Sequence, residues 1–441
     1  MDDRHLVALG FRWENTWAMP PKHRGPRWPK GWPSYNGAHP AANEYPMSAV
    51  HPFIALYALM YAAFGVSSPF MPAFFEARGL KPEQLGFLFA IGTMIRLISG
   101  PLCGRLADLT QALRSVLAVC AALAALIALG LLPTSGFWAL LLISALHAAA
   151  LAPITMLADA LALAAAVPFA GTTRFEYGLA RGTGSAAFIA GTLVSGQVVS
   201  AWGLPSIIVS HAALLSAAAW AAMLVPEHAR PEPFPPLAGH APPGGMLDLL
   251  RIRPFRRVML VSALVLGSHA MHDAFAVIRW STAGVTPAMA SVLWSESVAA
   301  EVIVFVLIGP RLVQRLSPAG VMAIAAIAGV LRWVGMALTT DVMALAMVQP
   351  LHGLTFAALH LACMRLISAI VPTHLAATAQ AMYALGAGAT TALLTLASGK
   401  LYARLGAEGF MVMALLCAAA APLTLGLRST YAEVIAPRRR P

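Results

Sequence analysis

Three ionisable side chains in the second half of the chain have residue types suited to moving a proton. Glu301 lies in the apolar run "LWSESVAAEVIVFVLIG" (293–309), and Arg332 and His352 lie in later apolar runs. A charge at the centre of a membrane-spanning helix costs about 2.5–3.5 kcal/mol, so each residue needs a cavity or a partner. A carboxylate that binds a proton, an arginine that tunes it and a histidine that exchanges protons near neutrality form a relay. The alternative is a buried Glu–Arg pair that only specifies helix packing.

The run "SHAMHDAF" contributes a second polar group. His269, His272 and Asp273 are spaced i, i+3 and i+4, so they share one helical face. Such a face could bind a metal, but no further ligand follows at a fixed spacing, so we expect it to line a polar cavity. Glu296 is a further cavity candidate, although it lies about 140° around the helix from Glu301 and nearer the outer end, where it could reach solvent.

The first half offers fewer such residues, and Arg96 is the most informative. A fixed cation in an apolar cavity suits the carboxylate of an anionic substrate through a bidentate pair. The alternative, equally open from sequence, is that Arg96 pairs with an internal acid such as Glu301 or Asp159. His147, in the middle of an apolar run, and His360 complete the candidate cavity residues.

The elements that must hold these residues are membrane-spanning helices. The 441 residues are 59% hydrophobic and 11% charged, with a mean hydropathy of +0.74, whereas soluble domains are roughly 25% charged. The sequence therefore predicts an all-α integral membrane protein with twelve transmembrane helices, each an apolar run of about 20 residues, at 50–74, 85–107, 114–132, 137–162, 176–201, 204–225, 256–280, 287–309, 318–339, 341–366, 374–401 and 406–428.

The basic residues predict the orientation. When successive loops alternate sides, 22 of the 29 Lys and Arg residues lie on the side of the N-terminus. The positive-inside rule then places both termini in the cytoplasm of a multi-pass protein in a bacterial-type inner (plasma) membrane, where basic loops can contact anionic lipid. The net charge of +11 does not predict nucleic-acid binding, because the basic residues are not clustered with aromatic ones.

An internal repeat divides the chain into two six-helix halves. "LVSGQVVSAWG" (193–203) and "LASGKLYARLG" (396–406) share L-x-S-G and a closing glycine at an offset of 203, and Gly104 and Gly309 differ by 205. Parallel halves with a site at their interface are typical of a secondary transporter. We expect the two halves at 49–225 and 256–428, joined by a cytoplasmic Pro/Gly-rich linker at 226–255. Before them, residues 1–48 are expected to be a disordered cytoplasmic extension or the result of a mis-assigned start, with Met47 as the true start. A basic cytoplasmic tail is expected at 429–441.

Other function classes find little support. The four cysteines have no C-x-x-C spacing, so we expect neither disulfides nor zinc. No H-E-x-x-H, G-x-S-x-G or P-loop motif is present, which disfavours a polytopic membrane enzyme or an ATP-driven pump. We therefore expect no catalytic residue, no metal and no cofactor. A receptor without transport is also disfavoured.

The chain resembles a known family in two places. "GRLADLTQALR" (104–114) is similar to the loop signature of the major facilitator superfamily at Gly104, Asp108 and Arg114, which implies a gating role, but it departs at Leu109 and Ala112. The segments 279–302, 331–338 and 351–367 resemble the phenylpropionic acid permease-like group, relatives of the proton-coupled sugar and nucleoside symporters.

The resemblance implies a major facilitator fold and a function. In the related sugar symporters a Glu, an Arg and a His in spans eight, nine and ten belong to the coupling machinery, which corresponds here to Glu301, Arg332 and His352. We expect a monomer that carries protons with a small organic solute such as an aromatic carboxylate. Sugar or nucleoside symport is the alternative, followed by drug efflux by antiport.

Overall fold

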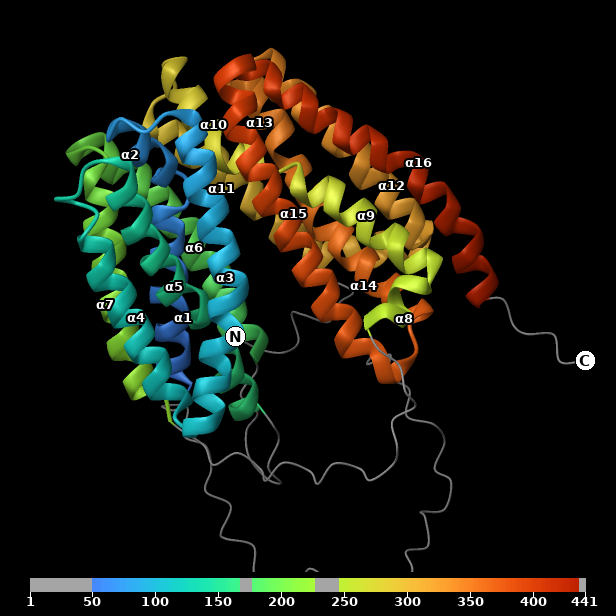
Figure 1. Cartoon of the computed structure of the whole chain (residues 1–441), viewed down its shortest axis with the longest axis horizontal. Coiled ribbons are helices and arrows are strands. Elements are labelled where there is room, and N and C mark those ends of the chain that lie inside the picture. Colours follow the sequence, from blue (N-terminus) through green and yellow to red (C-terminus); the bar gives the residue numbers. More distant parts are fainter. Residues whose placement is uncertain (1–49, 167–176, 227–245, 436–441) are drawn as a thin grey trace, which may run out of the picture. The chain divides into compact units, whose positions relative to one another are not determined.

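The computed structural model describes residues 50–166, 177–226 and 246–435, and within these ranges it contains helices and no strand. The predicted N-terminal extension, most of the linker and the end of the basic tail lie outside the described residues. The helices drawn in blue to green come from the first half of the chain and those in yellow to red from the second (Figure 1).

Seven helices are found among the described residues of the first half. Proline in the first turn begins α1, α2, α3 and α7, where its missing N–H has no intrahelical acceptor to lose. Helices α1 and α2 bend by 43° relative to each other. The helices are α1 His51–Ser67, α2 Met71–Ala77, α3 Pro82–Thr110, α4 Leu113–Leu129, α5 Phe137–Ala166, α6 Tyr177–Trp202 and α7 Pro205–Leu224.

The second half is more interrupted. Two π-helical segments, Val304–Ile308 and Leu354–Ala358, follow Glu301 and His352 closely, and such segments are frequent at functional sites. The α-helices are α8 Met246–Arg251, α9 Arg253–Gly267, α10 Ala270–Thr282, α11 Pro287–Ile303, α12 Gly309–Leu338, α13 Val342–Val348, α14 Leu359–Ile370, α15 Ala376–Leu405 and α16 Gly409–Ile435.

Two predicted boundaries differ from the structure. Helices α8 and α9 begin inside the predicted linker 226–255, and α16 extends past residue 428. Arginine side chains of α9 contact α8 and α16 at the first of these boundaries through hydrogen bonds to backbone carbonyls. Arg256 Nη1 donates to the Leu250 carbonyl over 2.6 Å, and Arg257 Nη1 donates to the Gly426 carbonyl over 2.8 Å.

The predicted apolar runs all overlap helices. Among the described residues, eight helical stretches are long and apolar enough to cross a membrane, or nine if the bent pair α1 and α2 is one span. Two of these stretches, 287–338 and 376–427, have 52 residues each and are interrupted at Ser317 and Gly406, whose φ angles are positive. Helix α4, with 17 residues, is just too short for this count. Twelve spans therefore stays a prediction.

The helix packing repeats between the two halves. In the first half α1 packs on α6 and α7, and α4 packs on α5 and α7. In the second half α9 packs on α15 and α16, and α12 packs on α14 and α16. Helix α3 meets α15 and α6 meets α11, which joins the two sets (Figure 1). The same order of contacts in both sets is what two parallel repeats produce.

Both L-x-S-G glycines lie at these joins. A Cβ on Gly196 of α6 would collide with the side chain of Ser291 and the carbonyl of Pro287 in α11. A Cβ on Gly399 of α15 would lie 2.6 Å from the carbonyl oxygen of Pro82 in α3. Glycine permits this close backbone approach. Both contacts lie at the helix ends that the charge pattern assigns to the outer side, so the two halves are in contact there.

We expect the Gly196→Trp variant to hold the outer side open. Overpacking costs about 1–3 kcal/mol, so the labelling rate of a Ser68→Cys reporter in the cavity by an impermeant maleimide should rise roughly 5- to 100-fold. Gly182→Trp is the matched control on the same helix, because a Cβ at Gly182 has no atom within 4 Å. Equal labelling in both variants would mean that this contact does not close the outer side.

Candidate functional site

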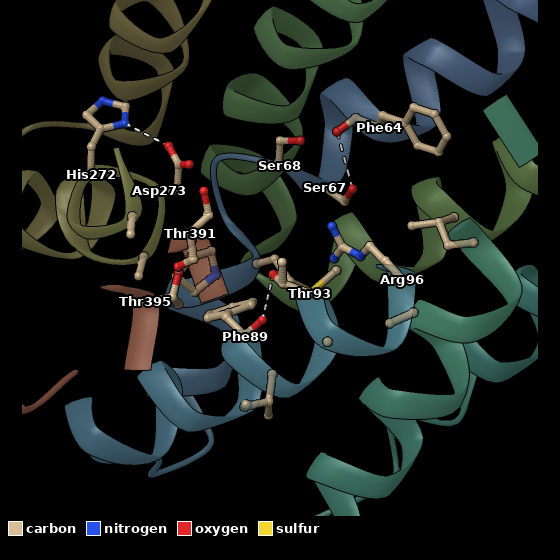
Figure 2. Close-up of a pocket in the computed structure, with 18 of the residues that line it drawn as sticks. Phe64, Ser67, Ser68, Phe89, Thr93, Arg96, His272, Asp273, Thr391 and Thr395 are labelled. Atoms are coloured by element: carbon tan, nitrogen blue, oxygen red, sulfur yellow. Dashed lines mark hydrogen bonds and ion pairs between the residues drawn. The ribbon is translucent and has the colours of Figure 1, made fainter. Parts of the chain in front are cut away.

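A cavity of about 700 Å³ lies between the two sets of helices, a volume suited to a small organic molecule. Its walls combine aromatic rings and hydroxyl groups with charged and titratable side chains. Figure 2 shows part of this lining, with Arg96 on one wall and His272 and Asp273 on the other. The charged and titratable residues that line it are Arg96 and His147 from the first half, and His272, Asp273, Glu301, Arg332 and His352 from the second.

Glu301, His352 and Arg332 contact one another in sequence. His352 Nε2 lies 3.4 Å from Glu301 Oε2, and Arg332 Nη1 lies 3.0 Å from His352 Nδ1. The Arg332 side chain is fully buried, whereas about a quarter of the Glu301 side chain is exposed. The carboxylate therefore faces the cavity, and the arginine stands behind the histidine.

The arginine determines which nitrogen of each neighbouring histidine carries the proton. A guanidinium can only donate hydrogen bonds, so His352 Nδ1 must accept and its Nε2–H points to Glu301. The same holds on the other side, where Arg332 Nη2 lies 3.4 Å from His272 Nε2 and His272 Nδ1 lies 3.2 Å from Asp273 Oδ1. Arg332 is thus linked to one carboxylate on each side through a neutral imidazole.

Further contacts stabilise the buried cation. Arg332 Nη2 donates to Gln349 Oε1 over 3.0 Å, and the Ser297 hydroxyl donates to the same oxygen over 2.8 Å. The guanidinium carbon of Arg332 also lies 4.6 Å from the centre of the Trp333 ring, within range of a cation–π interaction. These contacts offset part of the cost of burying the charge.

Interruptions in the helices bring Glu301 and His352 together. Pro350 cannot donate a backbone hydrogen bond, and α13 gives way there to a short 3₁₀ turn that places Gln349 and His352. At Gly353 a Cβ would lie 2.7 Å from the carbonyl oxygen of Ala300, so the absence of a side chain lets this segment approach α11 closely. The close approach sets His352 beside Glu301.

Arg96 differs from Arg332 because no acceptor is found for it among the described residues. The two acids considered as partners are engaged elsewhere. Glu301 contacts His352, and Asp159 accepts hydrogen bonds from the hydroxyls of Tyr57 over 2.6 Å and Tyr177 over 3.1 Å. Arg96 projects into the cavity near the labelled hydroxyls (Figure 2). It is therefore placed to bind an acceptor that enters the cavity.

The model of the MFS_1 like family matches residues 53–412. The chain belongs to this family. It is 32% identical over 367 residues to the probable 3-phenylpropionic acid transporter of Escherichia coli (strain K12), covering 81% of this chain and 93% of that one. It is also 23% identical over 325 residues to the uncharacterized transporter YwbF of Bacillus subtilis (strain 168), covering 73% and 79%.

Solved structures show the same fold. The nucleoside transporter NupG superposes with a TM-score of 0.70 at 16% identity, covering 87% of this chain and 99% of that one. A bacterial homologue of the human lysosomal transporter Spinster gives a TM-score of 0.67 at 14% identity, covering 88% and 98%. The predicted superfamily and its helical membrane fold are confirmed. This member of the MFS_1 like family is a multi-pass membrane transporter and not an enzyme.

Three residues that the sequence predicted to line the cavity, His269, Glu296 and His360, are not among those that line it. His269 instead packs against the rings of Trp333 and His352, at centroid distances of 5.3 and 5.0 Å. His360 lies beside the ring of Tyr383, with 5.8 Å between centroids. Glu296 does not line the cavity because it lies about 140° around α11 from Glu301, whose side of the helix faces the cavity.

The residues of the loop signature are placed as follows. Gly104 and Asp108 belong to the end of α3 rather than to a loop, and a Cβ on Gly104 would lie 3.0 Å from Met156 Cε. Arg114 Nη1 donates to the Val225 carbonyl over 3.4 Å, which ties α4 to the end of α7. This contact lies within the first half of the chain. The gating role of these residues stays a prediction.

Sequence reasoning did not identify the neutral members of the site. Gln349 and Ser297 complete the polar shell of Arg332, and Trp294 stacks on His272 with 5.0 Å between ring centroids. An amide in the apolar run "MVQPLHG" was a usable signal for Gln349. Among residues 50–166, 177–226 and 246–435, no group of three or more His, Cys, Asp or Glu side chains could hold a metal ion.

Proposed function

We propose that the protein is a proton-coupled symporter of a small aromatic carboxylate. The observation that carries this proposal is that Arg96, for which the described residues supply no acceptor, faces the same cavity as Glu301. One group suits a substrate anion and the other suits a proton. A transporter that holds both in one cavity can move them together.

The substrate half of the proposal rests on the chemistry of the cavity wall. A guanidinium binds a carboxylate through two parallel hydrogen bonds, which also orients the ligand. Aromatic side chains at Phe64, Phe89 and Trp294 line the same cavity and can pack against an aromatic ring. The name of the E. coli relative, a probable 3-phenylpropionic acid transporter, agrees with this class of ligand.

The proton half rests on the exposed end of the relay. Glu301 is accessible from the cavity. When it is protonated it has no net charge, so it no longer attracts Arg332 and His352 electrostatically. Protonation therefore weakens the electrostatic link between α11 and the segment that carries His352. We propose that this change, with substrate bound at Arg96, favours the exchange between inward- and outward-facing states.

The membrane arrangement is also part of the proposal. The excess of basic residues on one side supports cytoplasmic termini and a bacterial-type inner membrane. With that orientation, the contacts at Gly196 and Gly399 close the outer side, so the conformation described here would face the cytoplasm. We propose that the monomer is the functional unit.

A substrate panel tests this function. Phenylpropionate-like acids, nucleosides and sugars are added to lightly buffered, de-energised cells that express the protein, and the external pH is followed. We expect alkalinisation only with the aromatic acids, above the signal of cells without the protein, which reports passive entry of the neutral acid. Alkalinisation by nucleosides or sugars instead would favour the alternative symport, and silence with every solute would contradict the proposal.

A further inference from the structure

A pair of buried histidines in the first half has no role in the proposed transport cycle. His147 of α5 and His211 of α7 face each other with their Nε2 atoms 3.3 Å apart. The rings form an edge-to-face pair with 5.2 Å between centroids. His211 is fully buried, and His147 is 8% exposed and lines the cavity.

Backbone carbonyls determine that the Nδ1 atom of each ring carries a hydrogen. His147 Nδ1 lies 3.0 Å from the Ala124 carbonyl oxygen in α4, and His211 Nδ1 lies 2.8 Å from the Ala63 carbonyl oxygen in α1. A carbonyl oxygen can only accept, so each Nδ1 must carry a hydrogen. In two neutral rings, both Nε2 atoms then present lone pairs to each other, and no hydrogen lies between them.

One added proton resolves this conflict. A proton between the Nε2 atoms converts two facing lone pairs into an N–H···N hydrogen bond, so that one ring becomes an imidazolium and its partner stays neutral. The net charge of the pair changes from zero to +1. We propose that His147 and His211 form a second proton-binding site that holds a single shared proton, reached from the cavity through His147.

The surroundings of the pair limit it to a single proton. Arg96 on α3 is the charged group of a neighbouring element that acts on His147, and its positive charge opposes a proton there, whereas the backbone carbonyls of α1 and α4 favour one. A metal ion would need more ligands than two imidazoles, and none of the described His, Cys, Asp and Glu side chains gather in threes for that purpose. The hydrogen bonds to the carbonyls of Ala124 in α4 and Ala63 in α1 hold the two rings in place.

The site has a consequence for the cavity. A proton on the pair adds a second positive charge beside Arg96, which favours an anion at that wall. By linkage, an anion bound at Arg96 favours the proton to the same degree. The pair is separate in space from Glu301, which lies on the wall contributed by the second half.

Substrate-free proton titration of the purified protein in nanodiscs tests the proposal. Protons bound between about pH 8 and about pH 5 are counted for wild type and for His147→Gln, His211→Gln and the double variant. A glutamine amide donates a neutral N–H to the remaining ring and so replaces the shared proton. Each single variant should bind one proton fewer than wild type, and the double variant should also bind only one fewer.

His374→Gln is the control, because His374 is exposed and lies in the short turn before α15. Adding this change should leave the difference between wild type and His211→Gln unaltered. A double His147/His211 variant that loses two protons would mean that the rings titrate independently, and one that loses none would mean that the pair holds no proton. Either result would overturn the proposal. No substrate is used, so the outcome does not depend on the proposed cargo.

Discussion

Cells that express the Glu301→Gln variant should accumulate 3-phenylpropionate no more than cells without the protein, whose level reports passive entry of the neutral acid. Glutamine keeps a carbonyl oxygen that can accept from His352 Nε2–H, so the local packing is preserved. It cannot bind or release a proton, so the cycle loses its link to the proton gradient. Exchange of internal for external substrate should persist, because exchange needs no net proton movement.

Glu296→Gln is the matched control for this result. It makes the same chemical change on the same helix, at a residue that does not line the cavity. Accumulation above the level of cells without the protein should match wild type in the control and be absent in Glu301→Gln, as measured with radiolabelled substrate in energised cells. Accumulation that survives in the Glu301→Gln variant would show that another group carries the proton.

Removal of the Arg96 guanidinium should have the largest effect on substrate binding. Truncating one partner of a hydrogen-bonded charge pair costs about 2–5 kcal/mol, so Arg96→Gln should weaken binding of 3-phenylpropionate by roughly 30-fold or more. Arg96→Lys keeps the charge but loses the bidentate geometry, so its loss should be smaller, on the order of tenfold. Calorimetric titration of the purified protein measures both.

Two controls separate this role from general damage. The neutral alcohol 3-phenylpropan-1-ol lacks the carboxylate, so it should bind wild type and Arg96→Gln equally. Arg105→Gln removes an exposed arginine from the same helix and should leave acid binding unchanged. If Arg96→Gln bound the acid as tightly as wild type, the carboxylate would have to bind elsewhere in the cavity.

The sequence predicted the fold class because membrane insertion constrains sequence strongly. Each span must be apolar over its whole length, so the runs are visible without knowledge of the tertiary contacts. The boundaries were less accurate at the linker, where α8 and α9 begin and Arg256 donates to the Leu250 carbonyl near the end of α8. Side-chain hydrogen bonds to carbonyls near helix ends leave no periodic signal in composition.

Part of the candidate site was visible for the same reason. Charged residues such as Glu301, Arg332 and Arg96 stand out in apolar runs because their burial is costly. The sequence left the partners open, and for Arg96 the acids considered as partners are engaged with other residues. Neutral or singly placed polar residues such as Gln349 and His211 gave weaker signals, since their role depends on contacts between helices far apart in the chain.

Uptake into proteoliposomes tests proton-coupled carboxylate transport most directly. The purified protein is reconstituted, an inward-directed proton gradient is imposed, and the initial rate of radiolabelled 3-phenylpropionate uptake is measured against protein-free liposomes, which report passive entry of the neutral acid. We predict a saturable, protein-dependent rate that rises with the proton gradient. When an uncoupler collapses the gradient, the rate should fall to the value measured without a gradient. Protein-dependent uptake that is unchanged by the uncoupler would contradict proton coupling.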